Sequence, residues 1–447
     1  MKKSLFFLLV ISVFSANSLW ATHLRSGEIS YELIDESNFT YKITVKAYND
    51  VNSEVRLGDG TLYFGDGTSM ILPMVDTTRL NSQVGYSESS VTHSYGEPGN
   101  YLIQYAEANR NPNVINIGNS INTILYLESF IAINDEVVMS KKSPELLAPP
   151  VFTGQYGKEI NVSLAVKNEQ DLKIRYELVA CKQWVNIEVE DYFIPEGVSV
   201  DPITGLFTWL PSEDDAIGEY NFALKIAQFA LVDGEYQMVA FVVRDFQIIL
   251  KDIDGAVKIN DEDVEPIDNN NALVLEPNNS DSLYVYATMN SGEVNFEVFS
   301  DLENVEAEQL NDSLYLELEM TDELSRVNPY IVTVRVTYQV EPDSLVNDFN
   351  FLVYSQPTEE PDIEIPDTNE LITANEEKYE VPLPYPNPAK DKIYLDKVFL
   401  PKEVKVVDMK GNVYSRTIVD HMIDISHLPA GVYILELAND RYQFIKE

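Results

Sequence analysis

Short runs in which apolar and polar residues alternate recur along most of this 447-residue chain and constrain its fold more than any other feature. In residues 332–340, four valines and a tyrosine alternate with threonine, arginine and glutamine. Residues 41–47 and 314–320 show the same pattern. Because successive side chains of a strand point to opposite faces, a period of two predicts half-buried β-strands. The chain is therefore predicted to be all-β.

The first 21 residues have the parts of a secretory signal peptide. Lys2 and Lys3 give a positive start, residues 5–14 are apolar, and small residues before Thr22 offer a cleavage point. The apolar run is too short to span a bilayer, and no later run reaches about 18 apolar residues. We therefore expect an exported chain without a transmembrane segment.

Cys181 is the only cysteine, so the exported chain can hold no internal disulfide. Its cohesion must come from hydrophobic cores, for which 447 residues are ample. Cys181 ends an apolar run, where we expect a small buried hydrophobe rather than a reactive thiol. A catalytic thiol would need a basic partner, and the sequence pairs none of its four histidines with it.

The net charge of -42 at pH 7 limits the partners of this chain. So acidic a protein is repelled by phosphate backbones and by anionic membrane surfaces, which argues against nucleic acid and membranes as partners. The plainest use of the charge is solubility outside the cell. Divalent cations stay open as ligands.

Composition and proline-rich stretches divide the chain into segments. Prolines at 144, 149 and 150 form a hinge that cannot continue a central strand. Residues 356–380 hold three prolines and nine acids against one lysine, which predicts an extended linker. The predicted organisation is a signal peptide (1–21), three β-sandwiches (22–142, 143–250 and 251–355), a linker (356–380) and a C-terminal module (381–447).

The first sandwich carries two linked motifs. Residues 63–68 read Tyr-Phe-Gly-Asp-Gly-Thr, and residues 93–99 read His-Ser-Tyr-Gly-Glu-Pro-Gly. This segment resembles a polycystic kidney disease (PKD) domain, an immunoglobulin-like sandwich with an aromatic residue before Gly-Asp-Gly and a later His-x-Tyr. The glycines and the aspartate predict a turn. The alternative is a metal-binding or catalytic pair of Asp66 and His93.

The second sandwich has its own signature. Residues 201–209 read Asp-Pro-Ile-Thr-Gly-Leu-Phe-Thr-Trp, and Gly-Glu-Tyr follows at 218–220. The segment resembles the cadherin-like or putative-Ig modules of bacterial surface proteins. Many relatives carry an acidic calcium cluster where this chain has only Glu-Gln-Asp at 169–171. Trp184 and Trp209 lie in apolar runs, so we expect core anchors rather than ligand platforms.

The third sandwich is the most acidic segment, with 23 Asp/Glu against three Lys/Arg over residues 252–355. Its alternating runs predict a folded domain rather than a disordered tail. Residues 252–261 mimic part of a calcium loop, but the first ligand position would fall on Leu250, which excludes a standard EF-hand. Weak Ca²⁺ binding stays an alternative to a solvated surface. Asp-Ser-Leu triplets begin at Asp281, Asp312 and Asp343. They resemble a short pattern that Bacteroidetes use for O-glycosylation of exported proteins, but strand starts would produce such triplets by chance about as readily.

The C-terminal module differs from the rest because its nine acids balance its nine Lys/Arg residues. Alternation within it predicts a small antiparallel β-sandwich. The sequence Leu-Pro-Ala-Gly at 428–431 fits a type I turn. Tyr-Pro-Asn-Pro-Ala stands at 385–389, and a strand ending at Asp408 is followed by Met-Lys-Gly.

These motifs, in this order, resemble the C-terminal sorting domain that Bacteroidetes proteins carry as the address for the type IX secretion system. The resemblance implies partners in that machinery and an outer-surface or extracellular location, reached through the periplasm. It also implies removal of the domain, with release of the product or its tethering to surface lipopolysaccharide. The residues implied in sorting recognition are Pro386, Asn387, Pro388, Asp408, Gly411, Leu428, Pro429, Gly431, Tyr433 and Lys446.

Two functions remain open for the body of the chain. The first is an adhesin-like binding or structural role with an extracellular glycan or protein ligand. The second is a secreted hydrolase such as a carboxylate-pair glycosidase, because acids are abundant and their separations are not set by sequence. The chain has no His-Glu-x-x-His and no Gly-x-Ser-x-Gly motif. We therefore predict tandem immunoglobulin-like sandwiches that are not an enzyme, with no catalytic, cofactor or metal residues.

Overall fold

β-Strands make up nearly all of the regular structure, which confirms the all-β prediction, and the described residues add three single-turn 3-10 helices. Within the described parts, no helix is long and apolar enough to cross a membrane. The predicted signal peptide lies outside them. The computed structural model describes residues 24–51, 56–58, 60–80, 84–107, 110–133, 140–253, 257–260, 264–268, 270–289, 294–340, 343–357, 363–366, 389–394, 403–408, 412–419, 422–437 and 440–446.

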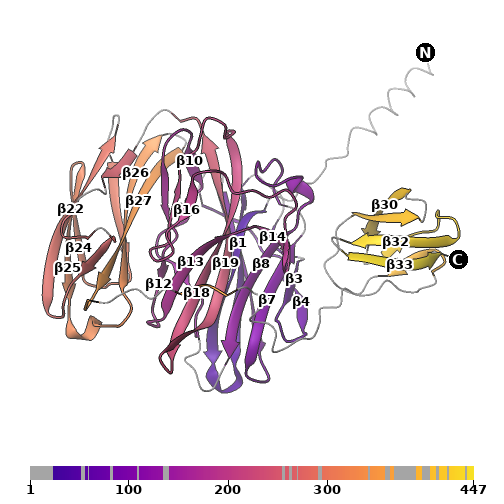
Figure 1. Ribbon diagram of the computed structural model, residues 1–447, viewed down its shortest axis with the longest axis horizontal. Coiled ribbons are helices and arrows are strands. Elements are labelled where there is room, and N and C mark those ends of the chain that lie inside the picture. The colour runs from indigo at the N-terminus through magenta and orange to yellow at the C-terminus, as the bar shows by residue number, and fades with distance from the viewer. Residues whose placement is uncertain are drawn as a thin grey trace, which may run out of the picture.

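The first segment packs two groups of strands across one core (Figure 1). Tyr41, Ile43 and Val45, from one of the alternating runs, are fully buried in this core. One group holds β1 (Leu24–Asp35), β2 (Thr40–Asp50), β5 (Thr78–Arg79) and β6 (Val84–Ser94), with the short helix η1 (Glu36–Asn38) after β1. The other holds β3 (Thr61–Tyr63), β4 (Ser69–Ile71), β7 (Gly99–Glu107) and β8 (Leu125–Ile133), with η2 (Ser120–Asn122) before β8.

The second segment builds its core around aromatic rings. Trp209 is fully buried, as predicted, with the ring centroids of Tyr220 and Phe222 at 4.9 and 5.7 Å. One wall consists of β11 (Ile160–Ser163), β16 (Val198–Val200) and β17 (Leu206–Trp209). The other consists of β10 (Thr153–Gln155), β13 (Lys173–Val179), β18 (Gly218–Val232) and β19 (Glu235–Lys251). Two short pairs lie beside them: β9 (Glu145–Leu146) with β12 (Val166–Lys167), and β14 (Lys182–Trp184) with β15 (Ile187–Glu188).

Strand β19 joins the first two segments in one sheet. It pairs with β18 along almost its whole length, with β8 at residues 240–242, with β1 through Asp245 and with β10 at 249–251. It can do so because β18 occupies only one edge of β19, which leaves the other edge to pair in turn with β8, β1 and β10. The boundary at residue 142 stays a prediction, but the strands on its two sides form a continuous twelve-stranded sheet.

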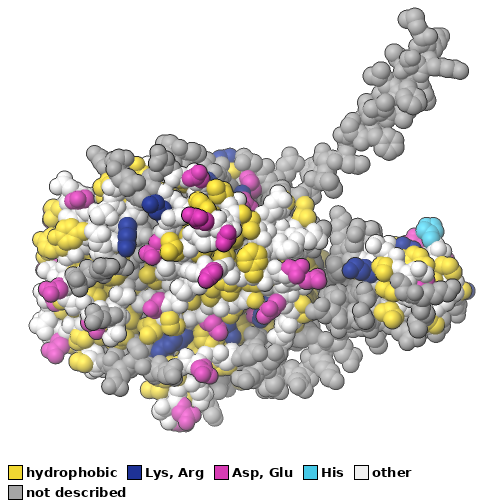
Figure 2. All heavy atoms as spheres, turned by 45° about the horizontal axis from the view of Figure 1, so that its top comes forward, with side chains coloured by type: hydrophobic (Ala, Val, Ile, Leu, Met, Phe, Trp, Pro, Cys, Tyr) yellow, Lys and Arg dark blue, Asp and Glu magenta, His cyan; other side chains and the backbone are white. Residues whose placement is uncertain are grey.

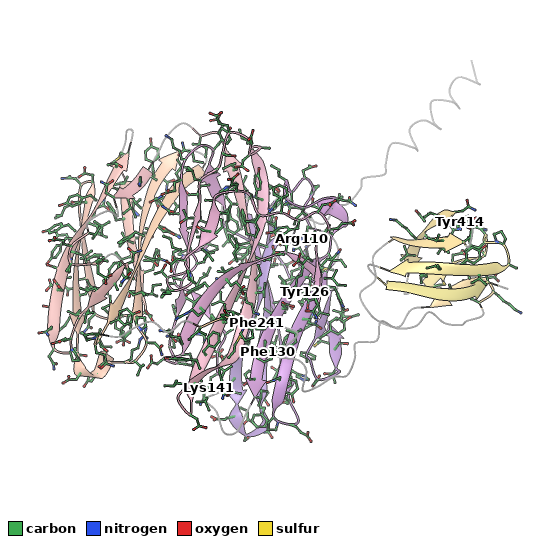
Figure 3. All side chains as sticks on the ribbon, viewed as in Figure 1. Arg110, Tyr126, Phe130, Lys141, Phe241 and Tyr414 are labelled. Carbon is green, nitrogen blue, oxygen red and sulfur yellow. The ribbon has the colours of Figure 1, made fainter. Side chains whose placement is uncertain are left out.

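The contact between these two segments is also apolar. Phe130 of β8 stacks on Phe241 of β19 with ring centroids 5.5 Å apart, and Figure 3 labels both residues in the middle of the body. Cys181 is fully buried in the same cluster, as predicted for a small hydrophobe. Trp184 is only half-buried and reaches across to Tyr63 and Tyr126 of the first segment. The two segments therefore share hydrophobic surface as well as strand hydrogen bonds.

The third segment is a sandwich of two four-stranded sheets around its own core. Val332, Val334 and Val336 from the alternating run are fully buried there. One sheet consists of β20 (Val257–Asn260), β22 (Asn279–Met289), β24 (Val305–Leu310) and β25 (Ser313–Met320). The other consists of β21 (Ala272–Val274), β23 (Val294–Ser300), β26 (Tyr330–Val340) and β27 (Asp343–Tyr354), and η3 (Asp322–Leu324) precedes β26.

Buried polar groups connect the second and third segments. Arg335 binds Asp348 through two hydrogen bonds of 2.8 and 2.7 Å, and both side chains are almost fully buried. The same carboxylate accepts the backbone N–H of Ser163 at 2.7 Å, and Arg335 also donates to the Pro149 carbonyl. Arg335 and Asp348 belong to the third segment, whereas Ser163 and Pro149 belong to the second. These hydrogen bonds therefore hold the two segments in one relative orientation.

The acidic charge is spread over the surface. Figure 2 shows Asp and Glu side chains scattered across the visible face of the body, with few Lys and Arg among them. The predicted linker is described only at residues 356–357 and 363–366. Its Ile363 and Ile365 pack against the apolar cluster shared by the first two segments, and Lys225 donates to the Pro366 carbonyl at 2.8 Å. This part of the linker therefore lies on the body.

Candidate functional site

The C-terminal module forms a separate sheet of six antiparallel strands, drawn in yellow in Figure 1. Val406, Ile423 and Leu435 are fully buried in its small core. This agrees with the alternation that predicts a small β-module here. The strands, in spatial order, are β28 (Lys392–Tyr394), β31 (Met422–Asp424), β30 (Val413–Val419), β29 (Glu403–Asp408), β32 (Gly431–Leu437) and β33 (Asp440–Lys446).

The Leu-Pro-Ala-Gly motif leads into β32. Leu428 and Tyr433 are each only 4% exposed, and the Tyr433 hydroxyl donates to the Pro429 carbonyl at 2.8 Å. Burial first, and then Tyr414 and Asp408, raise the pKa of Tyr433, which keeps this donor protonated. The hydrogen-bonded turn lies at residues 425–428, just before the predicted turn at 428–431, because β32 already begins at Gly431. Leu428 and Tyr433 thus hold the motif in place, while Pro429 is exposed.

Asp408 closes a hairpin. Its carboxylate accepts the backbone N–H of Asn412 at 2.9 Å and the Asn412 side-chain amide at 2.7 Å. The Asp408 backbone N–H also donates to the Asn412 carbonyl at 3.0 Å. An aspartate that caps a turn in this way fixes the direction of the chain between two strands. Gly411, predicted within this turn, lies outside the described residues.

The two ends of the module meet at Lys446. This residue of β33 is 8% exposed, pairs with Gly431 of β32 and forms a parallel bridge with Ala389. Ala389 directly follows the predicted Pro386, Asn387 and Pro388, which lie outside the described residues. Lys446 therefore lies next to both Ala389, the last residue of the Tyr-Pro-Asn-Pro-Ala motif, and Gly431, the last residue of the Leu-Pro-Ala-Gly motif. The role of these residues in recognition stays a prediction.

Comparison with known families decides what this module is. A family model described as the secretion system C-terminal sorting domain matches residues 384–447. The chain ends in a sorting domain. This confirms the predicted type IX sorting domain and an address outside the cell. A search of curated proteins found no match.

Solved structures with distant similarity consist of Ig and cadherin domains. Titin Ig tandem domains A164-A165 share 10% identity over 45% of this chain and 91% of that chain, with a TM-score of 0.17. The human desmocollin-1 ectodomain shares 13% identity over 71% and 66%, with a TM-score of 0.16. Zebrafish RET cadherin-like domains 1 to 4 share 8% identity over 96% of each chain, with a TM-score of 0.17. With TM-scores this low, we base no argument on these similarities.

Asp66 and His93, the alternative pair in the first segment, do lie together. His93 Nε2 is 2.7 Å from an Asp66 carboxylate oxygen, and the His93 ring stacks on Phe64 with centroids 3.9 Å apart. Burial acts to raise the pKa of Asp66, but hydrogen bonds from Thr68 and His93 lower it overall. Asp66 also accepts the backbone N–H of Thr68 at 2.9 Å, which makes it a turn-capping residue. These contacts give Asp66 and His93 a structural role, because they stabilise the Gly-Asp-Gly turn at residues 65–67.

The Cys181 thiol is fully buried, away from solvent. Burial, and then the negative charge of Asp245, raise the pKa of Cys181, so its thiol stays protonated. Among the described residues, no group of three His, Cys, Asp or Glu side chains could hold a metal ion. The predicted calcium-like loop at 252–261 is only partly described. Of the Asp-Ser-Leu serines, Ser282 is exposed whereas Ser313 is 8% exposed and donates to the Leu310 carbonyl.

An exposed aromatic row lies on the outer face of the third segment. Tyr284 and Tyr286 of β22 are 46% and 52% exposed, with ring centroids 6.4 Å apart. Tyr315 of β25 continues the row, with its ring centroid 5.1 Å from that of Tyr284. Tyrosine offers a large and rigid amphipathic contact area at low conformational cost. The row is a surface that a binding protein can use.

Sequence reasoning missed the polar residues inside β19. Arg244, Asp245 and Gln247 lie in the middle of an apolar run, and each is at least 94% buried. Asp245 is bound by Arg110, and Gln247 accepts from Arg25. These arginine partners lie more than a hundred residues away in the sequence, so no local motif marks the pairs. Arg244 also lines a cavity.

Proposed function

We propose that this chain is an exported binding or structural protein of the outer cell surface or the medium, with an adhesin-like body in front of its sorting domain. The single observation that carries the proposal is the match of residues 384–447 to the sorting domain. The body supports it through segments joined by a shared sheet and by buried polar contacts. A stiff body of this kind suits a protein that presents a surface at a distance.

The ligand in this proposal is an extracellular glycan or protein. The row of exposed Tyr284 and Tyr286 with half-buried Tyr315 supports a binding role, because tyrosines are enriched at recognition surfaces. The machinery of the type IX system is the partner during export, and surface lipopolysaccharide is the proposed tether after processing. No observation on the described residues favours the hydrolase alternative over this role.

The export proposal is tested by fractionating a host that has this secretion system. The full chain is compared with a version that ends at Glu380 and with two point variants, Leu428→Asp and His427→Asp. Leu428 is buried and His427 is exposed, so only the first variant places a charge in the sorting-domain core.

We expect the full chain and His427→Asp on the surface or in the medium, and the other two in the periplasm. Equal distribution of all four versions would refute the role of the tail. A glycan array and a cell-binding assay with the full exported chain then test the binding role.

A further inference from the structure

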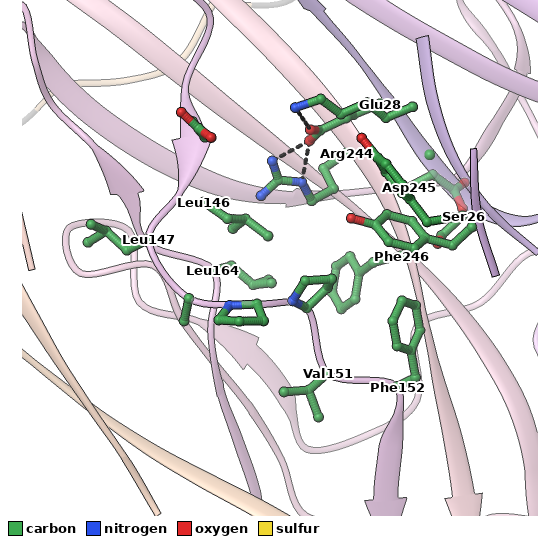
Figure 4. Close-up of a pocket in the computed structure, with 18 of the residues that line it drawn as sticks. Ser26, Glu28, Leu146, Leu147, Val151, Phe152, Leu164, Arg244, Asp245 and Phe246 are labelled. Atoms are coloured by element: carbon green, nitrogen blue, oxygen red, sulfur yellow. Dashed lines mark hydrogen bonds and ion pairs between the residues drawn. The ribbon is translucent and has the colours of Figure 1, made fainter. Parts of the chain in front are cut away.

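A cavity of about 410 Å³ lies at the junction of the segments. Its walls come from β1, β2 and β6 of the first segment, from residues 145–152, from β19 and from Phe299 of the third segment. In Figure 4, labelled residues from β1, from β19 and from residues 146–152 lie around it. Small-molecule sites in proteins span roughly 300–1,000 Å³ and occur preferentially where domains meet. The size and the place of this cavity therefore suit a small ligand.

Arg244 lines this cavity and keeps one buried donor unused. The residue is 6% exposed, and its Nε donates to a Glu28 carboxylate oxygen at 2.6 Å. Nη2 forms an ion pair with the same oxygen, whereas Nη1 is buried and has no hydrogen-bond partner in the described structure. In Figure 4, this remaining nitrogen is turned to the side where Leu146 lies. Because a buried charged donor without an acceptor is costly, the arrangement calls for an acceptor from outside the chain.

The charges of the wall favour an anion. Asp245, which also lines the cavity, is neutralised by its buried pairing with Arg110. Glu145 forms an ion pair with Lys142, which is not part of the wall. The charged lining residues that remain are Lys46, Lys167 and Arg244 against Glu28 and Glu145, and Glu28 is paired with both Arg244 and Lys46. This is an excess of cations in a protein whose net charge is -42.

The rest of the wall is apolar and aromatic. The Tyr48 ring lies between Tyr86 and Phe152, with centroid distances of 5.3 and 5.2 Å. Leu164 and Phe246 complete the floor. A bare inorganic anion would leave this surface without contact, whereas a ring or a short hydrocarbon body would cover it.

We propose that this cavity binds a small organic carboxylate. One carboxylate oxygen accepts a hydrogen bond from Arg244 Nη1, with Lys46 and Lys167 adding attraction, and the ligand's ring or hydrocarbon body packs against Tyr48 and Phe152. A guanidinium is the side chain best suited to a planar carboxylate. This inference rests on the proposed binding role of the body but is independent of the export route.

The test is isothermal titration calorimetry on the full mature chain. The probes are phenylacetate and glucuronate, with phenylacetamide and glucose as neutral counterparts and sulfate as an inorganic anion. We expect a carboxylate probe to bind at least about tenfold more tightly than its neutral counterpart, because a charged hydrogen bond is lost in the latter.

Two variants locate the binding. Arg244→Lys keeps a charge beside Glu28 but removes Nη1, and Leu146→Trp fills the cavity from a half-buried position without touching the ion pair. Both should weaken carboxylate binding about tenfold or more. The control Lys258→Glu alters an exposed lysine on β20 and should leave binding unchanged.

Three results would overturn the proposal: no carboxylate binds, sulfate binds as well as the carboxylates, or Leu146→Trp binds like the wild type. The last of these decides the matter even when Arg244→Lys does not fold. Fractionation of cells reports on export alone, so failure of the ligand and failure of the export proposal are distinguishable.

Discussion

Replacement of Arg110 by methionine is expected to lower the free energy of unfolding of the first two segments by about 3–5 kcal/mol. The Arg110 side chain is fully buried and forms two hydrogen bonds, of 3.0 and 2.6 Å, to Asp245. Burial acts to lower the pKa of Arg110, but the attraction of Asp245 outweighs it and raises that pKa. Methionine has a similar length and no charge, so Asp245 would be left as a buried carboxylate without its cation. Such an uncompensated charge sets the size of the loss.

Urea unfolding followed by tryptophan fluorescence measures this loss. Apart from Trp20 in the predicted signal peptide, the chain has only Trp184 and Trp209. Both lie in the second segment, and Trp184 also contacts the first, so the signal reports on the part that Arg110 stabilises. The matched control is Arg56→Met, which removes the pairing of an exposed arginine with Asp76 and should cost at most about 1 kcal/mol.

A double variant refines the test. Arg110→Met combined with Asp245→Leu removes both charges, and we expect it to regain most of the stability, because replacing a buried ion pair by apolar groups is often neutral. If Arg110→Met shifts the urea midpoint no more than Arg56→Met does, the pair is not buried in solution and the reasoning is refuted.

Two further predictions concern backbone conformation and pH. Both Gly157 and Gly205 have a positive φ, so Gly157→Ala should cost about 1 kcal/mol of the free energy of unfolding. Gly205→Ala should cost more, because only there would the new Cβ lie 2.8 Å from the Tyr176 ring. Equal urea midpoints for the two variants would contradict this. Burial acts to raise the pKa of Glu28, but Arg244 and Lys46 lower it overall from 4.5, so its stabilisation is complete above about pH 4.5 and is lost as the pH falls through the lowered value. The melting temperatures of the wild type and Glu28→Gln should therefore converge on acidification from pH 6, and a constant gap would contradict the assignment.

Local pattern was enough to predict the strands. The runs at 41–47, 314–320 and 332–340 became β2, β25 and β26, because alternation directly records which face of a strand is buried. The sorting domain was also predictable, since its motifs are short, ordered and close together in the sequence. What these cases share is that the informative residues lie within one strand or one turn.

Long-range pairing was not predictable in the same way. Glu28 and Arg244 lie 216 residues apart, and neither stands in a motif, so the cavity that they line left no trace in the sequence. Nor could the run at 235–251 reveal that β19 pairs with strands of both neighbouring segments, because an apolar run records burial but not the partner. Lys446 shows the same limit: the resemblance to a sorting domain implied a role in recognition, and the structure adds that the residue is largely buried.

The shared strand β19 also determines how the body responds to mechanical load. In a string of independent sandwiches, a pull between the chain ends opens one sandwich at a time and lengthens the molecule in steps. Here the hydrogen bonds of β19 with β1, β8, β10 and β18 tie strands of the first two segments into one sheet. Traction would have to shear several strand pairs at once, so the first two segments should rupture in a single event. A protein held on a cell in flowing liquid would keep its reach until that event.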